Sequence, residues 1–194
     1  LIDCFGEVGS LCEHIHLPFQ AGSDRVLKGM KRGYTSREYL EKITALRRRC
    51  PGIRITSDAI VGFPGEEEED FQATLGLMRE VRFDNLFSFC YSEREGTAAA
   101  GMDRPVGEAV KRERLRRLQF LQEGHTLERN RAMIGRREEV LVEGPSRNSP
   151  REMTGRTRGN GIVNFPAGKQ LSGKTVSVRI VEAFLHSLRA ELEK

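Results

Sequence analysis

The stretch from Thr56 to Glu67, TSDAIVGFPGEE, constrains the fold more than any other part of the chain. It continues a β-branched, apolar run that starts near Ile53, passes through a Gly-Phe-Pro-Gly turn at 62–65 and enters five acidic residues at 66–70. Glycines allow a backbone to approach a ligand closely, and acidic residues suit a helix N-terminus. Because ligands of βα folds bind beyond the carboxyl ends of strands, the stretch predicts a strand that ends at a ligand site. A plain strand–turn–helix junction stays open as the alternative.

Strands and helices alternate along the first two thirds of the chain. Residues 14–19 and 85–91 have strand character like 53–61, and helical spacing follows at about 24–31, 35–50, 66–81 and from 106 onward. Such alternation favours a parallel sheet or a barrel, so we predict an α/β fold.

After about residue 128 the hydrophobic period changes from helical to alternating. Val140 and Val142 alternate with Leu141 and Glu143, and Val176, Val178 and Ile180 alternate with Ser177, Arg179 and Val181, with glycine-rich turns between the two segments. Short strands with glycine turns in about 65 residues are typical of a small all-β barrel of OB-like size. We therefore predict two domains, residues 1–128 and residues 129–194.

Charge is distributed unevenly between these two parts. The whole chain carries a net charge of +4, residues 1–128 carry −2 (19 basic, 21 acidic) and residues 129–194 carry +6 (13 basic, 7 acidic). A basic module after a near-neutral one suggests binding to a polyanion. The alternative is an ordinary solvated surface, and the same alternative is favoured for the basic helix face at 111–117.

The chain starts at Leu1, without the charged region and apolar core of a signal peptide, and without an apolar stretch long enough for a membrane span. We expect a cytoplasmic protein that does not bind a membrane, and a start that lies inside a longer protein. The four cysteines are separated by 8, 38 and 40 positions, whereas zinc and iron–sulfur loops use short spacings. Free thiols are therefore expected (Cys4, Cys12, Cys50, Cys90).

Polar side chains lie near the carboxyl ends of two of the predicted strands. Gln20 and Ser23 come after the strand at 14–19, and Asp58 lies within the strand at 53–61. An amide, a hydroxyl and a carboxylate suit the ribose hydroxyls and amino-acid part of a nucleoside ligand. The same residues could instead cap helices and tie loops.

The chain closely resembles the MiaB-type tRNA methylthiotransferases in four collinear segments: CEHIHLPFQAGSDRVLKGMKRGYT, SDAIVGFPGEEEEDF, FSFCYSEREGT and VLVEGPSR…GRTRGNGIVNFP. These are radical S-adenosylmethionine (SAM) enzymes that end in a TRAM domain. The resemblance implies the C-terminal half of a radical SAM partial (β/α) barrel, followed by an OB-like TRAM barrel.

The resemblance also implies where SAM binds. It places HLPFQAGS near the SAM ribose and AIVGFPGE beside the adenine, although Ala21 stands where a serine is more usual. The residues carried over as SAM neighbours are Gln20, Ser23, Asp58, Ile60 and Gly62.

Two parts of the family pattern are absent. The family has an N-terminal methylthiotransferase domain with three cluster cysteines and an early barrel CxxxCxxC loop, which together hold two 4Fe–4S clusters. No spacing of that kind occurs here, so the resemblance implies the C-terminal part of such an enzyme, without catalytic residues or metal ligands and inactive alone.

For the whole enzyme the resemblance implies SAM cleavage, sulfur insertion at the dimethylallyl-adenosine beside the tRNA anticodon, and methylation of that sulfur. The TRAM segment would bind tRNA, with Arg156, Arg158 and Arg189 on phosphates and Phe165 stacked on a base, although Phe165 could equally be barrel core. The alternatives are a sister methylthiotransferase acting on a ribosomal protein or on threonylcarbamoyl-adenosine in tRNA, and a non-catalytic RNA-binding fragment. The segment GRTRGNGIVNF favours the dimethylallyl-adenosine branch.

Overall fold

The computed structural model describes residues 1–147, 149 and 151–193. The chain forms two compact units. The sheet unit comprises residues 15–48 and 55–124, and the barrel unit comprises residues 1–14, 49–54 and the chain from residue 125 onward. The contacts of residues 1–14 and 49–54 group these residues with the barrel, so the two units differ from the predicted domains 1–128 and 129–194. The domain limits themselves stay a prediction.

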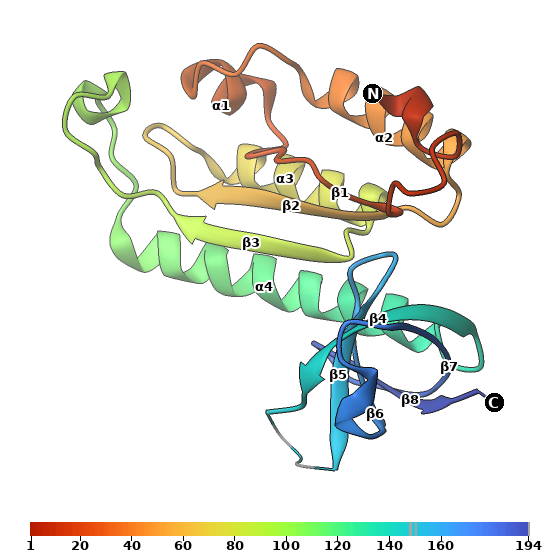
Figure 1. Ribbon diagram of the computed structural model, residues 1–194. Helices are drawn as coiled ribbons and strands as arrows, with labels where there is room; N and C mark the ends of the chain where they lie inside the picture. The colour runs from red at the N-terminus through yellow and green to blue at the C-terminus, as the bar shows by residue number, and fades with distance from the viewer. Residues whose placement is uncertain (148, 150, 194) are drawn as a thin grey trace. The chain divides into compact units, whose positions relative to one another are not determined.

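The sheet unit is built on three strands in the order β1 (His14–His16), β2 (Arg54–Val61) and β3 (Asn85–Cys90). β2 and β3 are parallel, with Asp58 opposite Phe87 and Ile60 opposite Phe89. The helices are α1 (Asp24–Gly29), α2 (Ser36–Arg49), α3 (Glu68–Val81) and α4 (Glu108–Arg131), with a short 3-10 helix η2 (Ala98–Gly101). In Figure 1, α3 lies behind β1 and β2, and α4 runs along β3. The predicted parallel α/β arrangement is confirmed.

The alternating burial along β2 separates two faces of the sheet. Ile55, Ser57, Ala59 and Val61 are buried, whereas the residues between them are only partly buried. On the buried side, Phe19 stacks on Phe83 with ring centroids 5.2 Å apart, which anchors the sheet to its helices. The opposite face is left partly open to ligands.

The barrel unit contains five strands: β4 (Arg137–Pro145), β5 (Glu152–Thr157), β6 (Ile162–Pro166), β7 (Thr175–Ala183) and β8 (Leu188–Leu192). They close in the order β4-β5-β6-β8-β7, with antiparallel pairs except for the parallel pair β6–β8. Two 3-10 helices, η1 (Ile2–Cys4) and η3 (Lys169–Leu171), belong to the same unit. The alternating apolar side chains fill the interior, so the predicted small β-barrel is confirmed.

In the part of the chain that the structure covers, no helix is both long and apolar enough to cross a membrane.

Candidate functional site at the carboxyl end of the sheet

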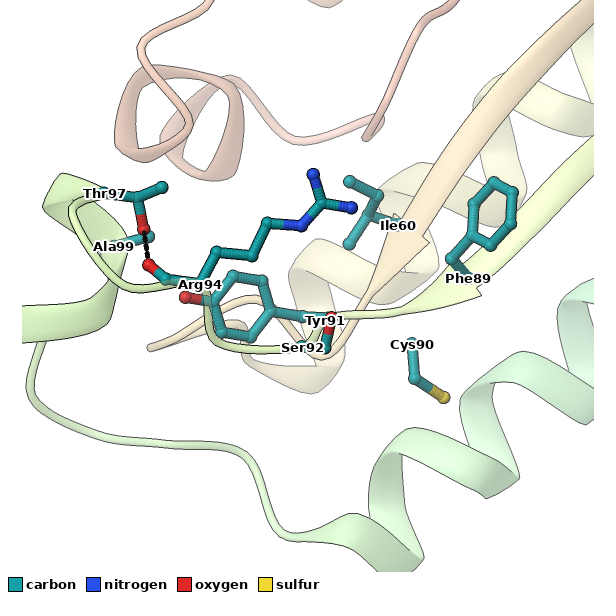
Figure 2. Close-up of a pocket in the computed structure, with 8 residues that line it drawn as sticks. All are labelled: Ile60, Phe89, Cys90, Tyr91, Ser92, Arg94, Thr97 and Ala99. Carbon is teal, nitrogen blue, oxygen red and sulfur yellow. Dashed lines mark hydrogen bonds between the residues drawn. The ribbon is translucent and has the colours of Figure 1, made fainter.

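A cavity of about 410 Å³ lies where β2 and β3 end. Its walls are formed by Ile60 of β2 and by residues of β3 and the following loop, namely Phe89, Cys90, Tyr91, Ser92, Arg94, Thr97 and Ala99 (Figure 2). The carboxyl end of parallel strands is where ligands of βα folds bind, and the volume falls in the range of about 300–1,000 Å³ of small-molecule sites. The expected ligand site is thus matched by a cavity at the expected edge of the sheet.

Gln20 lies next to this edge in an unusual backbone conformation. Its φ angle is 66°, in the left-handed region that non-glycine residues seldom adopt. Its N–H donates to the Asp58 carbonyl and its carbonyl accepts from the Ile60 N–H, both at 2.9 Å. The residue is 6% exposed, and its side-chain amide has no hydrogen bond to any residue within the described ranges. These features leave the Gln20 amide available to a ligand at the end of β2.

Asp58 is held on the open face of the sheet by a histidine. The Asp58 carboxylate lies 3.3 Å from His16 Nε2, and His16 Nδ1 lies 3.0 Å from Thr56 Oγ1. The His16 ring also meets Phe87 edge-on at 6.1 Å. Sequence reasoning named Asp58 but gave no role to His16, because a residue 42 positions away carries no local signal of this contact.

Ser23 is occupied inside the fold. Its hydroxyl donates to Asp70 Oδ1 at 2.6 Å and accepts the Val26 N–H at the start of α1. This is the helix-capping role that the sequence left open as the alternative. The position of Ser23 beside SAM stays a prediction.

Gly62 has a φ angle of +73°, and a Cβ atom there would collide with the side chain of Lys111. Its N–H donates to Glu66 at 2.9 Å, and Glu66 in turn pairs with Arg114 at 2.7 Å, both side chains being buried. Burial raises the pKa of Glu66, against the opposing effects of the Gly62 N–H and of Arg114. The glycine is needed for backbone shape and packing, and its role as a SAM neighbour stays a prediction.

Two cavity residues, Tyr91 and Arg94, were not assigned roles from the sequence. The Tyr91 hydroxyl is buried and has no hydrogen-bond partner among the residues the structure describes, while its ring packs edge-on against Phe63 at 5.3 Å. Arg94 is exposed, and its guanidinium forms no ion pair or hydrogen bond within the described residues. Figure 2 shows this guanidinium extended over the cavity in the direction of Ile60.

The arginines predicted to bind RNA are paired with carboxylates of the barrel unit. Arg156 lies 3.5 Å from Glu143, and Arg189 lies 2.7 Å from Glu152, which raises the pKa of the Arg189 guanidinium. Surface ion pairs of this kind are weak and leave some guanidinium N–H donors free. Phosphate contact by both arginines therefore stays a prediction.

Arg158 is more firmly engaged within the barrel unit. Its Nε donates to both carboxylate oxygens of Glu13 at 3.0 and 3.1 Å, and its Nη2 donates to the carbonyls of Gly9 and Leu11 at 2.9 Å. The Glu13 carboxylate raises the pKa of the Arg158 guanidinium. A phosphate contact of Arg158 stays a prediction, but the structure gives the side chain a role in holding the first residues of the chain.

Phe165 lies in the barrel core. It is fully buried among residues such as Val140, Met153 and Ile180. The core alternative that the sequence left open therefore describes Phe165, and stacking of its ring on a base is withdrawn because no face of the ring is accessible.

The four cysteines are free thiols. In the described ranges, no group of three His, Cys, Asp or Glu side chains could hold a metal ion. The residues present here do not fit an iron–sulfur cluster, which needs a set of converging thiolates.

Comparison with known proteins agrees with this architecture. The family described as "Radical SAM superfamily" matches residues 2–78, and the family described as "TRAM domain" matches residues 131–192. The chain is 59% identical over 192 residues to a tRNA-2-methylthio-N(6)-dimethylallyladenosine synthase of Syntrophus aciditrophicus. It is also 56% identical to the protein of the same name from Syntrophobacter fumaroxidans and 48% identical to that of Moorella thermoacetica.

Each alignment covers 99% of this chain but only 42–43% of the relative's length. The radical SAM match precedes the TRAM match along the chain, and the alignments to the relatives extend across both. The chain therefore joins a radical SAM segment to a TRAM domain, is similar to MiaB-type methylthiotransferases over nearly its whole length, and spans less than half of theirs.

Proposed function

We propose that the chain is the C-terminal part of a tRNA-2-methylthio-N6-dimethylallyladenosine synthase of the cytoplasm. The whole enzyme would insert sulfur at the dimethylallyl-adenosine beside the tRNA anticodon and methylate it. The observation that carries this proposal is the 59% identity over 192 residues to a relative of that name. A cavity at the carboxyl end of the parallel sheet supports it, because such an edge is where βα enzymes hold their ligands.

SAM would bind beside Gln20, Asp58 and Ile60. The Gln20 amide is nearly buried yet has no side-chain partner among the described residues, which fits a polar ligand group at this place. Ile60 supplies an apolar wall of the cavity for an adenine ring. Ser23 and Gly62 would act by fixing the two loops that carry these groups. When bound, SAM supplies the methyl group and the one-electron chemistry of the reaction.

The clusters of the family would be held by residues outside this chain. The described side chains include no converging ligand set, so we assign no chemical step to these residues through a cluster. The chain by itself is proposed to be inactive.

The barrel unit is proposed to bind tRNA. The net charge of +6 for residues 129–194 supports binding to a polyanion. Among the predicted arginines, Arg156 and Arg189 keep free donors at the surface, whereas four hydrogen bonds commit Arg158 to residues 9–13.

A chimera tests the proposal directly. This chain would replace the matching 192 residues of the Syntrophus aciditrophicus relative, and the modified nucleosides of tRNA would be identified by mass spectrometry. We expect 2-methylthio-N6-dimethylallyladenosine from the chimera and none from the 194-residue chain alone. A folded chimera with normal iron content that yields no such product, or that modifies threonylcarbamoyl-adenosine instead, would refute the assignment.

A further inference from the structure

The cavity wall formed by Phe89, next to Ile60, does not belong to the proposed SAM site. Phe89 is 55% exposed there, while six other phenylalanines, Phe5, Phe19, Phe63, Phe71, Phe83 and Phe165, are buried. Ile60 and Phe89 are partners in the β2–β3 register, so their side chains lie next to each other on the open face of the sheet. Together they form an apolar surface that a flat or hydrocarbon group could cover.

Arg94 places an available positive charge at the same cavity. Four arginines of the sheet unit are paired with carboxylates, Arg25 with Asp70, Arg104 with Glu67, Arg114 with Glu66 and Arg117 with Glu68, whereas those unpaired among the described residues, such as Arg112, do not line the cavity. Arg94 has no such partner within the described ranges and keeps all its donors for a ligand. A guanidinium in this state is suited to a phosphate, which accepts two parallel hydrogen bonds from it.

The loop that carries Arg94 is fixed to the rest of the unit. Tyr91 and Ala99 pack against the buried cluster of Ala21, Val26, Leu27 and Phe63. The Thr97 hydroxyl donates to the Arg94 carbonyl at 2.8 Å, as drawn in Figure 2. The loop that carries Arg94 is therefore fixed beside the apolar wall before any ligand arrives, and the guanidinium can reach a ligand in the cavity from it.

We propose that Phe89 and Arg94 form the subsite for the substrate nucleotide that bears a hydrocarbon group. Phe89 and Ile60 would cover the base and its hydrocarbon substituent, and Arg94 would meet a phosphate of the same RNA strand. The inference rests on the proposed function, since the chemistry of the nucleotide comes from it. Ile60 would be the wall shared with the cofactor, because atoms that react must come within about 3–3.5 Å of each other.

The test compares two RNA anticodon stem-loops, with and without the dimethylallyl group, for binding to the full 194-residue chain. Burial of one methylene changes an affinity by about fourfold, so partial burial of the group should give the modified RNA a preference of roughly tenfold. Phe89→Ala should reduce this preference to about twofold or less, and Phe89→Leu should keep most of it. Phe120→Ala is the matched control, since Phe120 is 80% exposed on α4, and it should change nothing.

Arg94→Gln should act differently from Phe89→Ala. It should weaken both RNAs equally and lower the slope of log affinity against log salt by somewhat under one unit. Arg112→Gln, an exposed arginine of α4, is its control. Binding of SAM measured by calorimetry should stay within about twofold in all five variants.

The outcomes separate this inference from the proposed function. If the chain binds RNA with salt dependence but Phe89→Ala leaves the preference unchanged, the subsite is wrong while the proposed function stands. If Phe89→Ala instead abolishes SAM binding, the cavity belongs to the cofactor alone and the subsite is again wrong. If neither RNA binds, both the subsite and the proposed RNA role are overturned.

Discussion

At the scale of single residues, Asp70 shows how a polar side chain can be assigned from the sequence only in part. The acidic run at 66–70 predicts a helix N-terminus, and α3 does begin there with a reciprocal capping box between Glu67 and Asp70. The sequence gives no sign that Asp70 also accepts hydrogen bonds from Ser23 and Arg25, which lie more than 40 positions away. For the same reason the sequence could offer Gln20 and Asp58 as candidate site residues but not Arg94, whose proposed role depends on its having no partner among the described residues.

Asp70 should make stability depend on pH below about 4. Burial alone would raise its pKa, but hydrogen bonds from Arg25, Ser23 and the Glu67 N–H outweigh burial and lower it. A carboxyl group with a lowered folded-state pKa stabilises the protein above its unfolded pKa of about 3.9, and this contribution disappears as the pH falls through the folded value. Asp70→Asn should therefore be less stable at pH 7 and lose less stability on acidification, as measured by urea unfolding between pH 7 and 3. Glu69→Gln, at the exposed neighbouring position, is the control, and equal pH profiles for Asp70→Asn and the parent would contradict the prediction.

At the scale of elements, hydrophobic period predicted the types of the elements well and their pairing poorly. The change from helical to alternating period near residue 128 indicated the barrel, and β4 to β8 follow it. Nothing local indicates that β6 pairs with β8 in parallel, because that contact depends on closure of the whole barrel. Phe165 shows the same limit, since an aromatic residue in an alternating strand can face either side until closure decides which.

The turn between β2 and α3 should be intolerant of a side chain at Gly62. Its φ angle of +73° disfavours other residues, and an added Cβ would collide with Lys111. Gly62→Ala should lower the free energy of unfolding by about 1–3 kcal/mol in urea titrations. Gly76→Ala is the matched control, because Gly76 lies inside α3 with open space around it, and the change should be neutral or stabilising by up to about 1 kcal/mol. Equal effects of the two substitutions would show that the turn is not strained.

At the scale of the whole molecule, the sequence gives net charge but not which charges are satisfied. The +6 of residues 129–194 predicts a basic module, yet the arginines selected within it all lie beside carboxylates. The partner of Arg158 is Glu13, 145 positions earlier, and such a contact cannot be inferred from local spacing. Lys169 of η3 and Lys174, just before β7, are exposed and have no ion pair with the residues that the structure covers.

Phosphate binding by the barrel unit should therefore depend more on its unpaired lysines than on its paired arginines. When an arginine that is paired with a carboxylate binds a phosphate, it either loses part of its attraction to the carboxylate or brings the negative carboxylate close to the RNA. An unpaired lysine that binds a phosphate loses only water and counterions. In the full chain, Lys169→Gln with Lys174→Gln should weaken tRNA binding at low salt and lower the salt slope by nearly two units. Arg156→Gln with Arg189→Gln is the charge-matched comparison and should lower the slope by less than one unit. The measurement is tRNA affinity by fluorescence anisotropy across a salt series, with thermal melting to establish that each variant is folded. If the arginine variant lowers the salt slope more than the lysine variant does, RNA binding breaks the ion pairs with Glu143 and Glu152, and Arg156 and Arg189 are the main phosphate contacts.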